Sequence, residues 1–320
     1  MIKSMSSDQK VLAGKSVLRR SQYVRALLRD RYLILLILPV VVYFILFAYY
    51  PLYGVIIAFK DYRVGLGIWG SPWVGFDHFI NFFNGIFFAR LLSNTLLISL
   101  YSLLWGFPIP IIFALMLNEF RNGAFKRTVQ TISYFPHFIS LVVVCGMVID
   151  FLSPTGGIVN QLIVRLGGTS INFLGQPQWF RTVLIGSTIW QSFGFGSIIY
   201  FAAISGINPE LYEAARIDGA GRLRQMWHVT LPGIRPTIVT LLILNIGNIM
   251  SVGFERIILL YSPATYATAD VISTYVYRIG LLGAQYSFAS AVGLFNSIIN
   301  IIILLSVNRL SKRMFDTSLW

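Results

Sequence analysis

Charged residues leave six long gaps along this chain. Stretches of 19 to 30 residues without Asp, Glu, Lys or Arg lie at 32–59, 91–118, 128–149, 182–209, 236–254 and 279–308. A helix needs about 20 apolar residues to cross the hydrocarbon layer of a membrane. The pattern therefore predicts an all-α integral membrane protein with six spans, at about 32–58, 91–117, 127–152, 180–204, 236–254 and 287–307.

The composition favours a membrane protein over a soluble protein with a large core. Only 12% of the 320 residues are charged, 56% are hydrophobic, and the mean hydropathy is +0.72. A soluble domain carries about 25% charged residues. The missing charges come from long blocks, so contact with hydrocarbon explains their absence better than burial in a protein core does.

The net charge of +13 is a signal of topology. The segments 1–31, 118–128, 205–235 and 308–320 together hold 18 of the 25 Lys and Arg residues. Positive residues remain on the cytoplasmic side of a membrane. Both termini and the 205–235 loop are therefore expected in the cytoplasm. A basic protein can also bind nucleic acid, but this placement argues against it, and no nucleic-acid partner is expected.

The chain is expected to have three parts. Residues 1–31 form a cytoplasmic segment, residues 32–307 the six-span transmembrane domain, and residues 308–320 a cytoplasmic tail. In the first part, residues 17–31 mix apolar side chains with arginines, which predicts a basic amphipathic helix at the membrane surface. The helix either braces the bundle or only flanks the first span, and the sequence leaves both possibilities open.

A charged segment at 210–236, ELYEAARIDGAGRLRQMWHVTLPGIRP, separates the fourth and fifth spans. Asn208-Pro209 predicts a helix start, with a capping side chain followed by proline in the first turn. Gly219 and Gly221 permit a sharp bend. The segment thus predicts a short helix, a bend and a second helix that ends before Pro232. It is longer and more polar than a simple connection needs, which indicates docking to a partner in the water phase.

This segment resembles the EAA loop in the permease subunits of binding-protein-dependent ABC importers. Seven residues stand at the positions of that motif: Glu213, Ala214, Ala215, Gly219, Val229, Leu231 and Pro232. Val229 replaces the more usual isoleucine. The resemblance implies a six-helix type I ABC importer permease fold with a cytoplasmic coupling loop. It also implies that a coupling helix docks on the ATPase subunit through Glu210, Glu213, Ala214, Ala215, Asp218, Gly219 and Ala220.

The segment PLYGVIIAFKDY at 51–62 resembles the carbohydrate-uptake branch of this family, and within it the permeases for complex oligosaccharides and alginate. The resemblance implies a subunit of the bacterial inner membrane that forms a pathway for oligosaccharides, including acidic ones. Its implied partners are membrane lipid, a second permease subunit in a heterodimer, two ATP-binding subunits and an extracytoplasmic binding protein. ATP and Mg²⁺ would then be bound by the ATPase partner, and this chain would need no cofactor.

Two other functions share parts of this pattern. A permease for peptides, phosphonates or amino acids has the same docking loop, so only the segment at 51–62 argues against it. A secondary transporter would be expected to carry ionisable residues or symmetric broken helices within its spans, and the six uncharged stretches argue against that. No catalytic residue and no metal site is expected, because Cys145 is the only cysteine and the six uncharged stretches contain no Asp, Glu, Lys or Arg.

Polar residues in the spans are candidates for the substrate pathway. Asn245 and Asn248 are three residues apart and share a helix face. Amides pair well with sugar hydroxyls, because they both donate and accept hydrogen bonds. Further candidates are Trp190, Gln191, Tyr200 and Asn296. Hydrogen bonding or packing between helices is an equally simple explanation for each of them.

A charge pair follows the fifth predicted span. Glu255 and Arg256 are adjacent, and the simplest expectation is a local pair that faces water. The alternative is that these charges serve as a gate or contact an acidic substrate.

Overall fold

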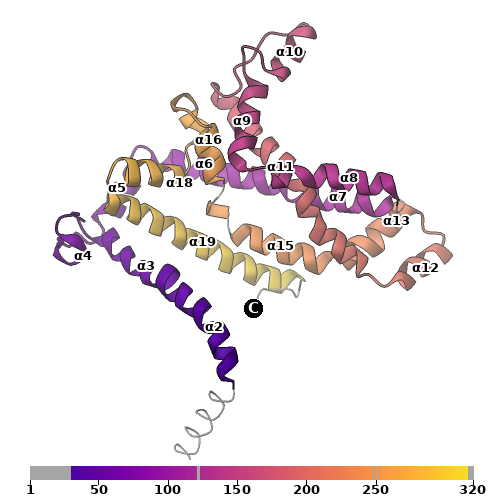
Figure 1. The fold of residues 1–320 in the computed structure, drawn as a ribbon, viewed down its shortest axis with the longest axis horizontal. Helices are drawn as coiled ribbons and strands as arrows, with labels where there is room; N and C mark the ends of the chain where they lie inside the picture. The colour runs from indigo at the N-terminus through magenta and orange to yellow at the C-terminus, as the bar shows by residue number, and fades with distance from the viewer. Residues whose placement is uncertain (1–29, 121–122, 248, 252, 316–320) are drawn as a thin grey trace, which may run out of the picture. The chain divides into compact units, whose positions relative to one another are not determined.

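The computed structural model describes residues 30–120, 123–247, 249–251 and 253–315 (Figure 1). Within these residues the chain is helical, apart from turns and one isolated antiparallel bridge between Lys60 and Trp73. The amphipathic helix predicted at 17–31 lies almost wholly outside them. The chain forms two compact units, Met1–Ile56 and Ile57–Trp320, which are described separately.

The first unit contains most of the first predicted span. Helix α2 (Arg31–Phe44) continues through a π-helical turn (Ile45–Tyr49) into α3 (Tyr50–Leu52). Pro39 lies inside α2. No side chain from 31 to 52 is buried, although nearly all are apolar. Such a surface is typical of a helix that faces lipid or another subunit.

The second unit holds the other spans and several short helices. The spans are built from α6 (Phe88–Tyr101), α7 (Pro108–Glu119), α8 (Ala124–Tyr134), α9 (Leu141–Leu152), α11 (Pro177–Ser205), α15 (Arg235–Gly247) and α19 (Tyr286–Phe315). The shorter helices are α4 (Gly67–Gly70), α5 (Asp77–Phe83), α10 (Ile158–Arg165), α12 (Pro209–Ile217), α13 (Arg222–Gln225), α14 (Leu231–Gly233), α16 (Phe254–Leu260), α17 (Tyr266–Ala269) and α18 (Ile272–Val276).

The third span is sharply bent, whereas the sequence predicted one span over 127–152. A 3₁₀ turn (Phe135–Phe138) ends the first half, and α9 starts in a direction 101° away. Pro136 lies in the first turn of the 3₁₀ segment, and Ser140 caps α9 by accepting a hydrogen bond from the backbone N–H of Val143. Proline and a serine cap are stop and start signals, and they break the span at this point.

The fifth span is also interrupted, so the prediction of one helix over 236–254 was wrong. Helix α15 ends at Gly247, and Gly253, with φ of 64°, precedes α16. The break exposes backbone carbonyls, which must find partners inside a membrane protein. Two amides of α19 supply them: Asn300 Nδ2 donates to the Gly247 carbonyl, and Asn296 Nδ2 donates to the Met250 carbonyl at 3.2 Å.

Helix α11 packs against α7 and α8, and α15 packs against α19 (Figure 1). The contact with α8 is close at Gly194, where an added Cβ would lie 2.0 Å from the Ser133 carbonyl oxygen. A buried hydrophobic cluster that includes Ala114, Tyr200 and Ile234 adds to the packing of α11. The close approach fixes the position of α11, on which most of the candidate site depends.

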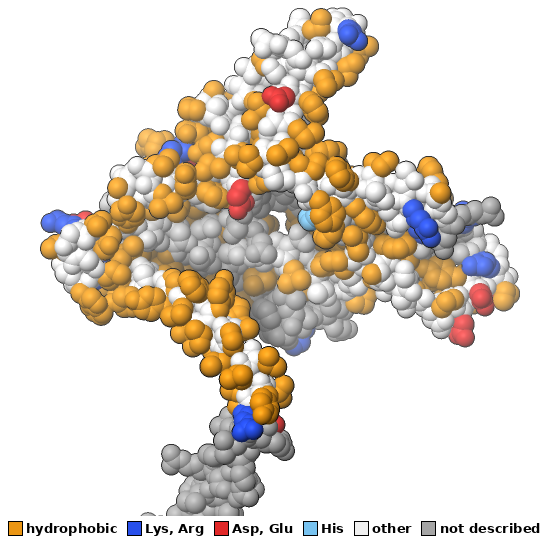
Figure 2. All heavy atoms as spheres, in the orientation of Figure 1, with side chains coloured by type: hydrophobic (Ala, Val, Ile, Leu, Met, Phe, Trp, Pro, Cys, Tyr) orange, Lys and Arg blue, Asp and Glu red, His pale blue; other side chains and the backbone are white. Residues whose placement is uncertain are grey.

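The surface is largely apolar on the face shown in Figure 2, and the few charged side chains are scattered toward the ends of elements. Among the described residues, four helices are long and apolar enough to cross a membrane, or six spans result if each of the two bent pairs counts as one. The bent pairs are the third span and the segment Arg222–Gly233 with Arg235–Gly247, which bends by 59°. This outcome agrees with the six predicted spans.

Candidate functional site

The first candidate site is the docking segment, residues 208–233, which connects α11 to α15. Its first helix, α12, begins as predicted, because the Asn208 side chain accepts a hydrogen bond from the Glu210 N–H at 3.1 Å. Pro209 occupies the first turn, where its missing N–H has no cost. Glu210 near the start and Arg216 in the last turn have the charges that the helix dipole favours.

A glycine in the left-handed conformation ends α12. Gly219 has φ of 73°, and its N–H donates to the Arg216 carbonyl at 3.0 Å. The Ala220 N–H donates back to the Ala215 carbonyl at 2.8 Å, so the turn closes the end of the helix. No atom lies within 4 Å of the position that a Cβ would take at Gly219. The backbone, rather than crowding, therefore requires glycine here.

The second part of the segment is longer than predicted. Helix α13 passes through a π-helical turn (Met226–Thr230) into α14, which contains Pro232. The expectation that the helix ends before Pro232 was wrong, because the wide turn precedes the proline and places it in the first turn of α14. Two contacts join the parts: Tyr212 Oη lies 3.0 Å from Thr230 Oγ1, and Gln225 Nε2 donates to the Ala220 carbonyl at 2.7 Å.

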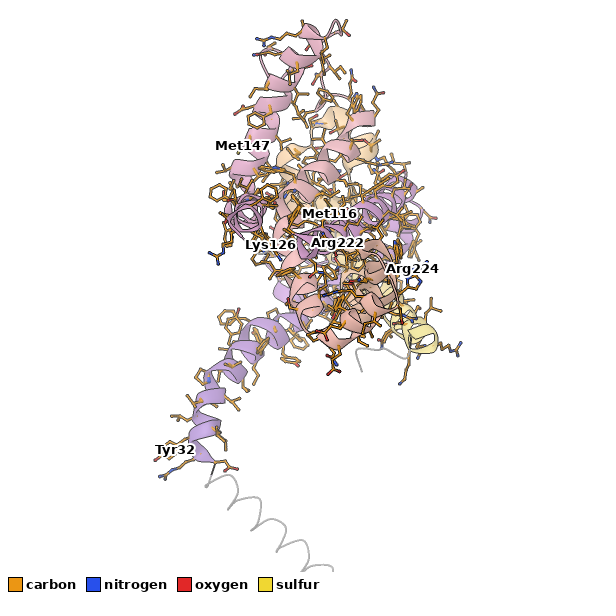
Figure 3. All side chains as sticks on the ribbon, turned by 90° about the vertical axis from the view of Figure 1, so that its right-hand side faces the viewer. Tyr32, Met116, Lys126, Met147, Arg222 and Arg224 are labelled. Carbon is orange, nitrogen blue, oxygen red and sulfur yellow. The ribbon has the colours of Figure 1, made fainter. Side chains whose placement is uncertain are left out.

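The docking segment presents an exposed surface around α12 within the described part of the chain. None of the residues of α12 is buried. Glu213, Ala214, Asp218 and Gly219 are exposed, while Ala215 and Ala220 are half-buried. Large apolar side chains are also exposed on the segment: Leu211, Ile217, Leu223 and Trp227. Figure 3 views the molecule from this end, where Arg222 and Arg224 are labelled. Exposed apolar residues with mixed charges are typical of a surface that binds another protein.

The second candidate site is a cavity of about 500 Å³ between the second, fourth and fifth spans. Helix α11 contributes a row of residues spaced by four positions, including Thr188, Ser192 and Gly196. The polar lining consists of Ser99, Ser102, Thr188, Ser192, Tyr200 and Asn245. The lining contains no charged side chain among the described residues. Hydroxyl and amide groups in an otherwise apolar cavity suit a ligand rich in hydroxyls.

The cavity brings together two of the predicted substrate residues. Asn245 and Tyr200 both line it. Asn245 Nδ2 donates to the Leu241 carbonyl of its own helix at 2.8 Å, and the amide oxygen takes no part in this bond. Thr188 and Ser192 likewise donate to carbonyls one turn earlier, each at 2.7 Å, and keep lone pairs as acceptors. Asn248 lies outside the described residues.

The other three predicted substrate residues lie elsewhere. Trp190 lines a separate cavity of about 510 Å³ between α9 and α11, whose wall is almost wholly apolar. Gln191 is buried and donates from Nε2 to the Ile139 carbonyl at 2.9 Å, at the bend of the third span. Asn296 lines a third cavity and supports the break in the fifth span. The rotation of the helices thus places these three residues at different sites, although the sequence suggested a common substrate pathway.

Sequence analysis missed the hydroxyl residues of this cavity. Ser99 and Ser102 on the second span, and Thr188 and Ser192 on the fourth, are part of its wall. The spacing of four between Thr188 and Ser192 places them on one helix face. That pattern was visible in the sequence.

Arg256 is not the water-facing residue that its neighbour Glu255 led us to expect. Its exposed fraction is 7%, while Glu255 is exposed. Arg256 Nη1 donates to Ser187 Oγ at 3.3 Å, and Nη2 donates to Gln191 Oε1. After the break in the fifth span, α16 begins behind Gly253 and packs against α9 and α11. Arg256 lies against α11.

A bundle of bent spans, a polar cavity between them and an exposed helical loop define the membrane subunit of a transport complex. The chain belongs to the family of binding-protein-dependent transport system inner membrane components, whose model matches residues 106–316. The predicted family and the all-α type I ABC importer permease fold are thereby confirmed.

Two relatives from Bacillus subtilis (strain 168) match nearly the whole chain. Protein LplB is 45% identical over 304 residues, which cover 95% of this chain and 94% of the relative. The polygalacturonan/rhamnogalacturonan transport system permease protein YteP is 46% identical over 302 residues, with 94% of each chain covered.

Two solved structures share the fold at similar identity. A bacterial ABC transporter involved in the import of the acidic polysaccharide alginate has a chain that is 48% identical, with a TM-score of 0.87, and the match covers 92% of this chain and 99% of that one. The bacterial alginate ABC transporter in complex with an alginate pentasaccharide-bound periplasmic protein has a chain that is 47% identical, with a TM-score of 0.86 and the same coverage.

Proposed function

We propose that this chain forms part of the pathway by which an ATP-driven importer moves oligosaccharides, including acidic ones, across the bacterial cytoplasmic membrane. The cavity with hydroxyl and amide walls between the second, fourth and fifth spans carries the proposal. Relatives that import polygalacturonan, rhamnogalacturonan and alginate support it. A permease for peptides or phosphonates remains the second candidate, since its docking segment would be the same, whereas membership in this family argues against a secondary transporter.

The partners follow from the two candidate sites. The exposed docking segment is proposed to bind one of two ATPase subunits, which hold ATP and Mg²⁺ and perform the hydrolysis. The cavity is lined in part by α15 and would face a second permease subunit, expected to be a different chain. An extracytoplasmic binding protein is proposed to deliver the sugar, a role supported by the structure of the alginate transporter in complex with an alginate pentasaccharide-bound periplasmic protein. Closure of the ATPase pair would move α12 and switch access to the cavity.

ATPase stimulation in the reconstituted complex tests this function. The complex of both permeases, the ATPases and the binding protein is assayed with trigalacturonate, with neutral trisaccharides and with tripeptides. We expect stimulation by a sugar and none by tripeptides. Stimulation by tripeptides alone would support the second candidate and exclude the sugar pathway.

Replacing Asn245 with leucine should weaken sugar transport about tenfold and leave the protein assembled. The change removes hydrogen bonds to the ligand worth roughly 1–3 kcal/mol, while among the described residues the amide donates to the Leu241 carbonyl of its own helix. Uptake kinetics of the single variant, and of a double variant with Asn248→Leu, measure the effect.

Asn300→Leu is the matched control for Asn245→Leu. Its amide supports the break in the fifth span, since it donates to the Gly247 carbonyl and accepts from the Met250 N–H at 3.4 Å. This variant should lower thermal stability instead of substrate affinity. Unchanged uptake kinetics in the double variant would remove the amide pair from the pathway.

The orientation of the chain is proposed from its charges, with both termini and residues 205–235 in the cytoplasm. In a Cys145→Ser background, a cysteine at Arg222 should resist an impermeant thiol reagent in intact cells, and a cysteine at Val64 should react. Both positions are exposed, and Val64 avoids the positive φ of neighbouring Gly67. Labelling at 222 and protection at 64 would reverse the orientation.

A further inference from the structure

Arg256 carries a buried positive charge with neutral partners. Its guanidinium is held by Ser187 Oγ and Gln191 Oε1, and its exposed fraction is 7%. No described carboxylate lies within ion-pair distance of it, and the adjacent Glu255 is exposed. A buried ionic cluster among the described residues differs, because there Asp270 pairs with Arg278 and Arg90. Arg256 thus contributes an uncompensated positive potential to its surroundings.

Structural support alone does not explain this charge. The contacts of Arg256 with α11 need two hydrogen-bond donors, which a neutral side chain can supply. Burying a full charge without a counter-ion costs free energy that neutral donors would not cost. Gln191 already makes the connection to the bend of the third span through its own bond to Ile139. The positive charge of Arg256 therefore needs an explanation other than structural support.

The charge lies against α11, the helix that lines both the polar cavity and the apolar cavity to which Ser187 belongs. Its two partners on α11, Ser187 and Gln191, each precede a residue that lines the cavity, Thr188 and Ser192. Gly253, three residues before Arg256, lines the cavity as well. The lining itself bears no charged side chain among the described residues. A low-dielectric wall between a fixed charge and a cavity transmits the potential instead of screening it.

We propose that Arg256 gives this cavity its preference for anionic oligosaccharides. The inference rests on the proposed sugar pathway and adds the residue that distinguishes a uronate from a neutral sugar. The carboxylates of a passing uronate would be attracted without direct contact, so the sugar is not trapped by a salt bridge. A unit charge about 10 Å from a carboxylate, at an effective dielectric constant of about 20, changes binding roughly tenfold.

Binding to the permease–ATPase complex in nanodiscs, without the binding protein, tests the proposal. The two ligands are trigalacturonate and its fully methyl-esterified form, in which each carboxylate is replaced by an uncharged and slightly larger methyl ester. Arg256→Gln removes the cation. Gln191→Glu leaves the guanidinium in place and adds a carboxylate beside it. Glu255→Gln is the control, because it changes a charge of equal size on an exposed neighbour.

We expect the wild-type complex to prefer the acid to the ester by about tenfold. Arg256→Gln and Gln191→Glu should both lose this preference through weaker acid binding, with ester binding unchanged, and Glu255→Gln should retain it. Equal losses for acid and ester would show a structural role and overturn the proposal, as would an acid preference that survives in Gln191→Glu. If the wild-type complex binds neither trisaccharide, the sugar pathway itself fails; if it binds both equally, only the role of Arg256 fails.

Discussion

Gly219→Val is expected to abolish coupled transport while the protein still inserts into the membrane. Gly219 adopts φ of 73°, which a β-branched residue reaches only with strain of about 1–3 kcal/mol. No residue of α12 is buried, so no packing energy holds the helix end against that strain. The turn should therefore open, and the exposed face from Glu210 to Ala220 should lose its shape. Uptake assays and co-purification of the ATPase subunits measure the loss.

Gly221→Val is the matched control for this prediction. Gly221 has φ of −66° and ψ of 166°, a conformation that valine favours, and no atom lies within 4 Å of its Cβ position. The same side chain two residues away should leave transport close to wild type. Wild-type uptake with normal ATPase attachment in Gly219→Val would contradict the docking role of this turn.

The sequence was sufficient for features that depend on local chemistry. The number of spans follows from uncharged length, because a membrane tolerates few charges over about 20 residues. The start of α12 follows from Asn208-Pro209, and its end follows from Gly219. These signals act within a few residues, so no knowledge of distant contacts is needed to interpret them.

The direction of each polar side chain could not be predicted in the same way. In a soluble helix the apolar face identifies the core, but in a membrane span both the lipid side and the core side are apolar. The apolar residues of α11 therefore do not reveal how the helix is rotated, and this rotation directs Gln191 toward Arg256 while Tyr200 lines the cavity. The interruption of the fifth span depends on Asn300, 53 residues beyond Gly247. Packing between distant segments decides such features.

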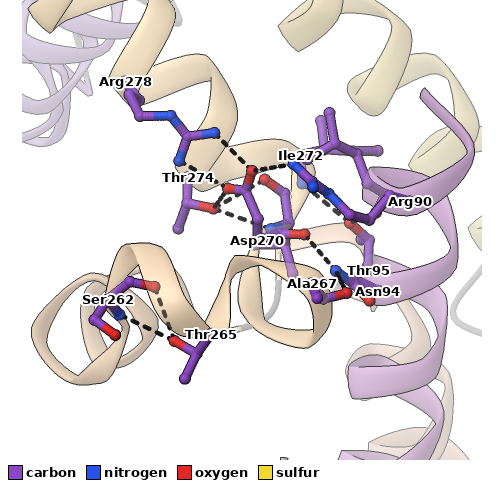
Figure 4. A network of polar contacts seen from close by, with 12 residues as sticks. Arg90, Asn94, Thr95, Ser262, Thr265, Ala267, Asp270, Ile272, Thr274 and Arg278 are labelled. Carbon is purple, nitrogen blue, oxygen red and sulfur yellow. Dashed lines mark hydrogen bonds and ion pairs between the residues drawn. The ribbon is translucent and has the colours of Figure 1, made fainter. Parts of the chain in front are cut away.

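Asp270→Asn is expected to destabilise the second unit by about 3 kcal/mol, the lower end of the range for breaking a buried ion pair. Asp270 is fully buried, and its carboxylate accepts hydrogen bonds from Arg278 at 2.6 and 3.1 Å and from Thr274 at 3.0 Å (Figure 4). Arg90 lies 3.6 Å away. An amide of nearly equal volume removes the negative charge and leaves both guanidinium groups uncompensated.

The network explains why the loss should spread beyond the short helices α17 and α18. Asn94 Nδ2 on α6 donates to the Asp270 carbonyl at 3.0 Å (Figure 4). Arg181 Nη2 on α11 donates to Asn94 Oδ1 at 2.8 Å. Burial alone would lower the pKa of Arg278, but hydrogen bonds to Asp270 and its charge outweigh burial and raise the pKa of Arg278 above its ordinary value. The segment between the fifth and sixth spans is thus tied to the second span through both the carboxylate of Asp270, by Arg90, and its backbone carbonyl, by Asn94, which in turn contacts the fourth span through Arg181.

Asp61→Asn provides the comparison for Asp270→Asn. Asp61 also pairs with an arginine, Arg63, at 2.9 Å, but the side chains of both residues are about half exposed or more. Solvent screens such a pair, and its removal should cost about 0–1 kcal/mol. Thermal unfolding of the purified complexes should show a clearly lower midpoint for Asp270→Asn and a nearly unchanged one for Asp61→Asn. Equal midpoints for the two variants would contradict the structural role of the buried carboxylate, because the same charge change would then have the same effect in water and in the core.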